Sequence, residues 1–82
     1  MYKADVFISL KKTVADPQGQ TIKHALESLN YKGISQVRAG KLVSISLEAR
    51  SKDEAAKAVD EMCKKLLANP VIEDYRFEIK EA

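Results

Sequence analysis

Residues 64–75 read KKLLANPVIEDY, and within this stretch a helical pattern of apolar residues ends and a strand pattern begins. Apolar residues recur at helical spacing as far as Leu67. Pro70 has no backbone N–H and disfavours a helical conformation at Asn69, so the helix must end there. From residue 71 to 79 the pattern fits a strand. This tight junction predicts that the helix packs against its own strand, with the remaining chain organised around that unit.

Length and composition describe one small folded domain. The chain has 82 residues, 45% of them hydrophobic and 32% charged, so we expect a single domain over 1–82. A formal net charge of +2 is too small to indicate nucleic-acid binding. No apolar run reaches the length of a membrane span, and the N-terminus does not resemble a signal peptide. The single cysteine cannot form an internal disulfide. We therefore expect a cytoplasmic chain that binds neither membrane nor nucleic acid.

Residues 2–10 alternate strictly between apolar and polar side chains, which predicts a half-buried strand with its even positions inward. Phe7 is an aromatic residue on the otherwise polar face. Two interpretations stay open: a lone exposed apolar side chain, which is common, or a contact with a second subunit.

Asp16 and Pro17 are typical of the N-cap and the first position of a helix. Gly19 is unexpected in a first turn, because glycine there costs up to about 1 kcal/mol relative to alanine. It indicates either the close approach of another backbone or ligand, or simply a helix start. The only histidine, His24, is expected at the surface. The apolar stripe of this helix consists of Ile22, Ala25, Leu26 and Leu29.

An extended segment is expected over 34–49, after Gly33 ends the first helix. Gly40 interrupts this segment, either as a bend in one long strand or as the turn of a hairpin. The residues around it carry positive charge, since Arg38 and Lys41 flank the glycine.

The second helix begins at a capping box, in which Ser51 caps the helix and Glu54 reaches back. Its broad apolar stripe includes Cys63, which we expect to be a buried thiol rather than a nucleophile. Leu66 falls in the same stripe, so Leu66→Ala is expected to cost about 2–5 kcal/mol.

The element order predicts an α/β (α+β) sandwich: two helices packed on one face of a three- to four-stranded, mostly antiparallel sheet. A hairpin at Gly40 would give a split βαβ, ferredoxin-like topology. In the last strand, over 71–79, Val71 is expected to point inward and Ile72 outward. The open face would then carry Phe7 and Ile72 and pair with another copy, so we predict a dimer.

Catalytic constellations are missing from the sequence. It contains no Ser-His-Asp or Cys-His set, no metal-ligand spacing and no glycine-rich phosphate loop. We therefore assign no catalytic, cofactor-binding or metal-binding residue to this chain.

Three blocks closely resemble the PurS family, the small subunit of phosphoribosylformylglycinamidine synthase in purine biosynthesis. They are VADPQG at 14–19, VRAGK at 37–41 and CKKLLANPVIEDY at 63–75. The resemblance covers nearly the whole chain in the order of the family.

The resemblance implies an enzyme subunit that is itself noncatalytic, within an ATP-dependent ligase of the glutamine amidotransferase type. In such a complex a glutaminase subunit releases ammonia from glutamine. A large synthetase subunit uses ATP and Mg to convert formylglycinamide ribonucleotide to its amidine. The small subunit, without a cofactor of its own, dimerises, brings the two together and is thought to help ammonia pass between them.

Three segments are the expected partner contacts: the Asp16–Gly19 turn, the bend at Gly40 and the helix–strand junction. We expect Gly19→Val to spare the dimer and weaken assembly. For the dimer contact we expect Phe7 and Ile72. The full set of expected partner contacts is Asp16, Pro17, Gln18, Gly19, Arg38, Gly40, Lys41, Asn69, Pro70, Glu73, Asp74 and Tyr75.

Two other functions compete with this one. A ferredoxin-like regulatory domain would bind a small molecule in a pocket at the N-terminus of the first helix. Nucleic-acid binding through Lys11, Lys12, Arg38 and Lys41 would need stacking aromatics beside a basic stripe, and the aromatics are scattered.

Overall fold

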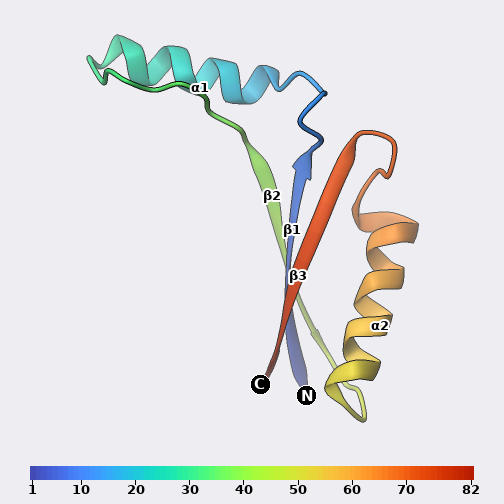
Figure 1. The fold of residues 1–82 in the computed structure, drawn as a ribbon. Helices are drawn as coiled ribbons and strands as arrows, with labels where there is room; N and C mark the ends of the chain where they lie inside the picture. The colour runs from blue at the N-terminus through green and yellow to red at the C-terminus, as the bar shows by residue number, and fades with distance from the viewer.

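The structure is a computed structural model that describes all residues, 1–82. Its three strands form one antiparallel sheet in the order β2-β1-β3 (Figure 1). The predicted α+β class and the order strand, helix, strand, helix, strand are confirmed. The elements are β1 (Tyr2–Leu10), α1 (Pro17–Ser28), β2 (Gly40–Leu47), α2 (Lys52–Met62), the π-helical turn η1 (Cys63–Leu67) and β3 (Glu73–Glu81).

The central strand β1 supplies the middle of the core. Its even-numbered residues Ala4, Val6 and Ile8 are buried, as the alternation predicted. The partly buried side chains around them on β2 and β3 continue the same face, because register places Val43 and Phe77 on either side of Val6. One face of the sheet is therefore apolar across all three strands.

Helix α2 covers part of this apolar face. Ser51 Oγ accepts a hydrogen bond from the Glu54 N–H at 3.1 Å, which confirms the predicted cap at the start of the helix. Val59 and Cys63 are fully buried against the sheet, and Ala55 is fully buried as well. The helix packs on β1 and β3 (Figure 1), so the inward-facing residues of β2, Val43, Ile45 and Leu47, remain only half-buried.

Helix α1 does not join α2 on the sheet, and the prediction that both helices pack on one face is wrong for this helix. Figure 1 shows α1 extending away from the end of the sheet, with the following segment running back along it. Leu29 of its apolar stripe is 68% exposed. The reason lies at the start of the helix, where backbone ties described below hold α1 beyond the sheet. We call residues 11–39 the α1 arm.

The prediction that Leu66 is buried is also wrong, because α2 ends in the π-helical turn η1. The Ala68 N–H donates to the Cys63 carbonyl at 3.0 Å, a five-residue spacing instead of four. The extra residue in this turn changes which positions of the apolar stripe face the sheet. Leu66 therefore points outward with 83% of its surface exposed, while Ala68 is buried.

Strand β3 begins at Glu73, two residues later than expected, and runs to Glu81. Val71 and Ile72 lie in the connecting turn, and both are exposed. The predictions that Val71 points inward and that Ile72 lies on the open sheet face are therefore wrong. The cause is local: Asn69 closes the turn, since its carbonyl accepts from the N–H groups of Ile72 and Glu73.

Gly40 is not the turn of a hairpin, and no fourth strand forms. Strand β2 begins at Gly40, and residues 34–39, the last part of the α1 arm, lead into it without pairing in the sheet. The ferredoxin-like alternative therefore does not describe this chain. Gly33 has the positive φ expected of it, 81°, where the chain turns back after α1.

Candidate functional site

The three segments predicted as partner contacts converge at one end of the sheet. Here β1 ends while β2 and β3 begin, because both neighbours run antiparallel to β1. Register places Gly40 and Asp74 on either side of Ser9. The N-terminus of α1 completes this end of the molecule, since Asp16 bonds to the residue before Gly40. We call the Asp16–Gly19, Arg38–Lys41 and Glu73–Tyr75 segments together the sheet-end cluster.

Asp16 is the central side chain of the cluster. Its Oδ1 accepts from the Gly19 N–H at 2.9 Å, and its Oδ2 accepts from the Ala39 N–H at 2.7 Å. Only 4% of the residue is exposed. The Gly19 hydrogen bond, then the Ala39 hydrogen bond and the charge of Arg38, hold the pKa of Asp16 below its usual value, although burial opposes them. The carboxylate is thus a charged tie between two backbone segments.

Gly19 is required by a close approach of backbone, the first of the alternatives considered above. A Cβ at this position would overlap the carbonyl oxygen of Val37. Any side chain would push the returning segment away from α1. Gly19→Val would therefore disturb the α1 arm itself and is not a clean probe of partner contact.

Arg38 is a second tie at the base of the α1 arm. One terminal guanidinium nitrogen donates to the carbonyls of Lys11 and Val14, each at 3.0 Å. It also lies 3.5 Å from the carbonyl of Leu10. Arg38 therefore stabilises the path of the chain between β1 and α1 through this one nitrogen.

The remaining charges of the cluster, on Lys41, Glu73 and Asp74, form ion pairs. Lys41 of β2 lies 3.5 Å from Glu73 of β3, and Lys11 lies 3.5 Å from Asp74. Exposed pairs of this kind contribute about 0–1 kcal/mol each, so they fix geometry more than stability.

The junction after α2 is held by Asn69 and Glu73. Asn69 Oδ1 accepts from the Val71 N–H at 3.0 Å, and Glu73 Oε1 accepts from the Asn69 N–H at 2.7 Å. Pro70, between them, is exposed. This part of the predicted contact set is accessible, whereas Asp16 and Gly19 are buried and only Pro17 and Gln18 of the first turn are exposed.

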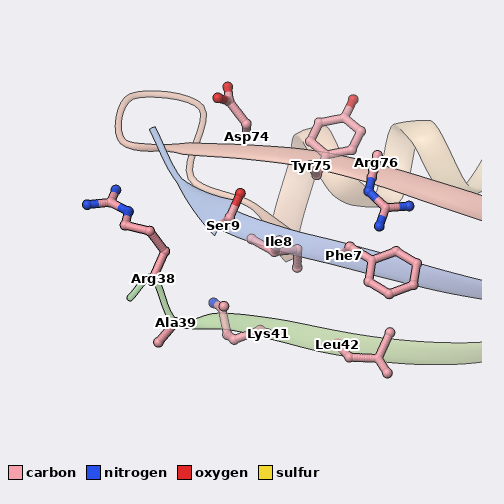
Figure 2. A pocket seen from close by; sticks show the side chains of 11 residues that line it. Phe7, Ile8, Ser9, Arg38, Ala39, Lys41, Leu42, Asp74, Tyr75 and Arg76 are labelled. Carbon is pink, nitrogen blue, oxygen red and sulfur yellow. The ribbon is translucent and has the colours of Figure 1, made fainter. Parts of the chain in front are cut away.

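A shallow hollow of about 490 Å³ lies beside the cluster (Figure 2). Phe7 forms part of its lining, and the Arg76 guanidinium carbon lies 4.1 Å from the centre of the Phe7 ring. Leu42 of β2 is paired with Phe7 and lies beside it on the side away from β3. Phe7 is half-buried and lies on the open face of the sheet, as the alternation predicted.

Tyr75 is held by a partner that sequence reasoning missed. Its hydroxyl donates to Asp60 Oδ1 of α2 at 2.6 Å, and Lys64 pairs with the other Asp60 oxygen at 3.1 Å. The Asp60 hydrogen bond raises the pKa of Tyr75 to about 12. The available signal was an inward-facing tyrosine, whose hydroxyl needs a partner when it is buried.

Asp16, Arg38 and Asp60 each bond to another segment of the chain. The thiol of Cys63 is buried, and burial together with the Asp60 charge raises its pKa, which disfavours the reactive thiolate. No group of three or more His, Cys, Asp or Glu side chains is arranged to hold a metal ion. Neither helix has the length and apolarity needed to cross a membrane.

The fold and the cluster define a small α+β domain whose charged residues set the direction of a projecting arm. A sequence model of the PurS family, described as phosphoribosylformylglycinamidine (FGAM) synthase, matches residues 3–81. The chain belongs to the PurS family.

Three relatives that match over almost their full length illustrate the similarity. The phosphoribosylformylglycinamidine synthase subunit PurS of Bacillus subtilis is 49% identical over 81 residues, which is 99% of this chain and 95% of that protein. The crystal structure of Methanocaldococcus jannaschii PurS is 44% identical with a TM-score of 0.91, covering 100% of this chain and 99% of that one. A chain in the structure of PurLQS from Thermotoga maritima is 30% identical with a TM-score of 0.88, covering 96% of each chain.

Proposed function

We propose that this chain is the noncatalytic small subunit of phosphoribosylformylglycinamidine synthase and that it bridges the glutaminase and synthetase subunits. It aids the transfer of ammonia for the ATP- and glutamine-dependent conversion of formylglycinamide ribonucleotide to its amidine. ATP and Mg act on the synthetase subunit, and this chain contributes surfaces. The observation that carries the proposal is the full-length match to PurS chains, one of them within PurLQS.

The engagement of the polar groups supports a role in assembly. Asp16 and Arg38 bond to backbone groups of the chain itself, and Asp60 bonds to Tyr75. A general acid or base must instead present a free group to a substrate in a pocket. The proposed contacts with the other subunits are the exposed residues of the sheet-end cluster and of the adjoining turn: Pro17, Gln18, Arg38, Gly40, Lys41, Asp74, Asn69 and Pro70.

We also propose a homodimer, because two apolar surfaces lack a cover within one chain. The stripe of α1 is exposed at Ile22 and Leu29, and Val43 and Ile45 of β2 are only half-buried. A helix of 12 residues without tertiary packing is marginal in water. A second copy would supply the missing packing, with Phe7 on the open face as a further candidate contact. Leu29→Asp is expected to shift the dimer to monomer in light scattering, while the exposed control Glu27→Asp leaves it unchanged.

The experiment that tests the bridging role is reconstitution from purified subunits. We expect this chain to migrate with the synthetase and glutaminase subunits in size-exclusion chromatography when ADP and glutamine are present. Without this chain, we expect the two larger subunits to separate. Comigration of the larger subunits at equal yield in its absence would contradict the proposal.

The regulatory alternative is less well supported by the geometry at the N-terminus of α1. A hollow of about 370 Å³ lies there, lined by Lys12, Gln20, Lys23 and other mostly polar residues. However, the space that Gly19 opens is filled by the Val37 carbonyl, which leaves no room there for a small molecule. One terminal nitrogen of Arg38 is engaged by backbone carbonyls.

A further inference from the structure

The face of the sheet that is turned away from α2 carries its charges in a regular order. Register and alternation place six charged side chains on this open face, three of each sign: Lys3, Asp5, Asp74, Arg76, Glu78 and Lys80. The sign alternates from one to the next along β3 and changes between Lys3 and Asp5 on β1, while β2 contributes no charge. Antiparallel sheets often leave one face in water, but a solvated face does not require such an order.

Neighbouring strands place like charges directly opposite each other on this face. Lys3 pairs in register with Lys80, and Asp5 pairs with Glu78. Like charges at directly opposite positions destabilise a sheet. Lys3, Lys80 and Asp5 form no ion pair within the chain, and Glu78 pairs only with Arg76, at 3.6 Å. We call Lys3 and Lys80 the positive row, and Asp5 and Glu78 the negative row.

The two rows are complementary to the same two rows of a second copy. A two-fold axis that crosses the strands between the rows lays the negative row of one copy over the positive row of the other. Lys3 then meets Asp5 of the second copy, and Lys80 meets Glu78 of the second copy. A two-fold axis parallel to the strands would instead set each row against itself. Because sheets twist, side chains close to the axis are the best aligned when two sheets pack face to face.

The other charges near this face do not decide the contact. Asp74 is already in an ion pair, and the Arg76 guanidinium lies over the Phe7 ring (Figure 2). Both belong to the first half of β3, so an axis near the other end of the strand places them at the edge of the contact. At the opposite end of the sheet, Glu48 and Arg50 follow β2, one of each sign. The positive and negative rows therefore determine which partner fits.

We propose that the open face is a second self-association surface, through which one homodimer binds another by pairing the negative row with the positive row. Ser44 donates to Asp5 Oδ1 at 2.9 Å, so one acid of the negative row is held in place before the contact forms. Phe7 and Leu42, which is 61% exposed, lie at the edge of the contact. This surface is separate from α1 and the inward face of β2, which are the main contacts proposed within the homodimer.

The test measures the mass of the full chain by analytical ultracentrifugation at low and high salt. We expect a species larger than the homodimer at low salt, which returns to the homodimer at high salt because exposed ion pairs are screened. Lys80→Glu should weaken this self-association at least about tenfold, because two acids then face each other across the contact. Its Tm should not fall, since an acid opposite Lys3 replaces a like-charge pair within the sheet. Lys57→Glu, a matched charge reversal at an exposed position of α2, should self-associate as the unaltered chain does.

Two double variants test the complementarity directly. Asp5→Lys/Glu78→Lys makes both rows positive, and Lys3→Glu/Lys80→Glu makes both rows negative. We expect each variant alone to remain a homodimer at low salt. An equal mixture of the two should regain the larger species, because faces of opposite charge then meet.

The proposal is overturned if the unaltered chain is no larger than a homodimer at low salt, or if Lys80→Glu self-associates as tightly as Lys57→Glu. It is also overturned if Lys80→Glu separates the homodimer itself, because the open face would then lie inside it. Should the double variants lower the Tm, Lys80→Glu alone decides the outcome. Failure of the unaltered chain to comigrate with the larger subunits contradicts the proposed function, which is a distinct result.

Discussion

Asp16 Oδ2 accepts a hydrogen bond from the Ala39 N–H at 2.7 Å and so joins two points of the chain that lie 23 residues apart. The same carboxylate caps α1 through Gly19. One side chain therefore fixes both the start of the helix and the return of the chain to β2. This relationship sets the direction of the α1 arm relative to the sheet.

Asp16→Asn is expected to lower the Tm and to loosen the α1 arm, because an amide offers one acceptor where the carboxylate offers two. Hydrogen exchange should show faster exchange at Gly19 and Ala39 than in β1. Protection at these amides equal to that of the unaltered chain would contradict the assigned role of Asp16.

The lowered pKa of Asp16 predicts that the stability of the folded protein depends on pH in the acid range. Its pKa in the folded protein lies below the usual value of 3.8, so its contribution to stability is complete above pH 3.8 and is lost as the pH falls further. Acid titrations followed by circular dichroism should show a shallower loss of stability in Asp16→Asn than in the unaltered chain.

Gly19→Ala is expected to destabilise the protein by about 1–3 kcal/mol, the usual cost of forcing an extra carbon into a filled space. The added Cβ meets the backbone of Val37, which cannot rotate away as a side chain could. Urea denaturation gives the measurement, and Gln18→Ala at the adjacent exposed position is the control, with a change within about 0.5 kcal/mol. Equal stability of the two variants would place the Val37 carbonyl elsewhere.

Two substitutions to alanine test whether the π-helical turn η1 turns Leu66 away from the core. Ile8→Ala removes a buried side chain beneath α2 and is expected to cost about 2–5 kcal/mol. Leu66→Ala should change the stability of the isolated chain by no more than about 0.5 kcal/mol, since Leu66 is exposed. A large loss from Leu66→Ala would mean that the helix continues in regular α geometry.

The raised pKa of Tyr75 predicts that the stability of the folded protein depends on pH in the basic range. Its pKa is raised from 10.0 to about 12 in the folded protein, so the contribution of its protonated hydroxyl is complete below pH 10 and is lost as the pH rises towards 12. Tyr75→Phe should lack this part of the loss, which is obtained as the difference between the two denaturation profiles. Identical profiles would mean that Tyr75 ionises at its ordinary pKa.

Local features of the fold could be predicted from the sequence, because short-range chemistry determines them. The alternation in 2–10 and the caps at Asp16 and Ser51 follow from neighbouring residues, whereas the crowding at Gly19 comes from Val37, a distant residue in the sequence. The direction of α1 could not be predicted, since an amphipathic stripe indicates that a face is covered without indicating by what. The exposure of Leu66 depends on a π-helical turn, and a sequence pattern with the 3.6-residue period of a regular α-helix does not predict such a turn.

The candidate contact segments could be chosen from the sequence, but their roles could not. Their convergence at one end of the sheet follows from the antiparallel topology. Asp16, Gly19 and Arg38 proved to be internal ties, because hydrogen-bond partners from distant parts of the chain meet only in the folded protein.

The central claim is that this chain couples the glutaminase to the synthetase. The direct measurement is the rate of amidine formation by the two larger subunits, with glutamine or with ammonium as the nitrogen source, in the presence and absence of this chain. We predict that glutamine-dependent turnover requires this chain, while ammonium-dependent turnover does not. A full glutamine-dependent rate without it would contradict the account.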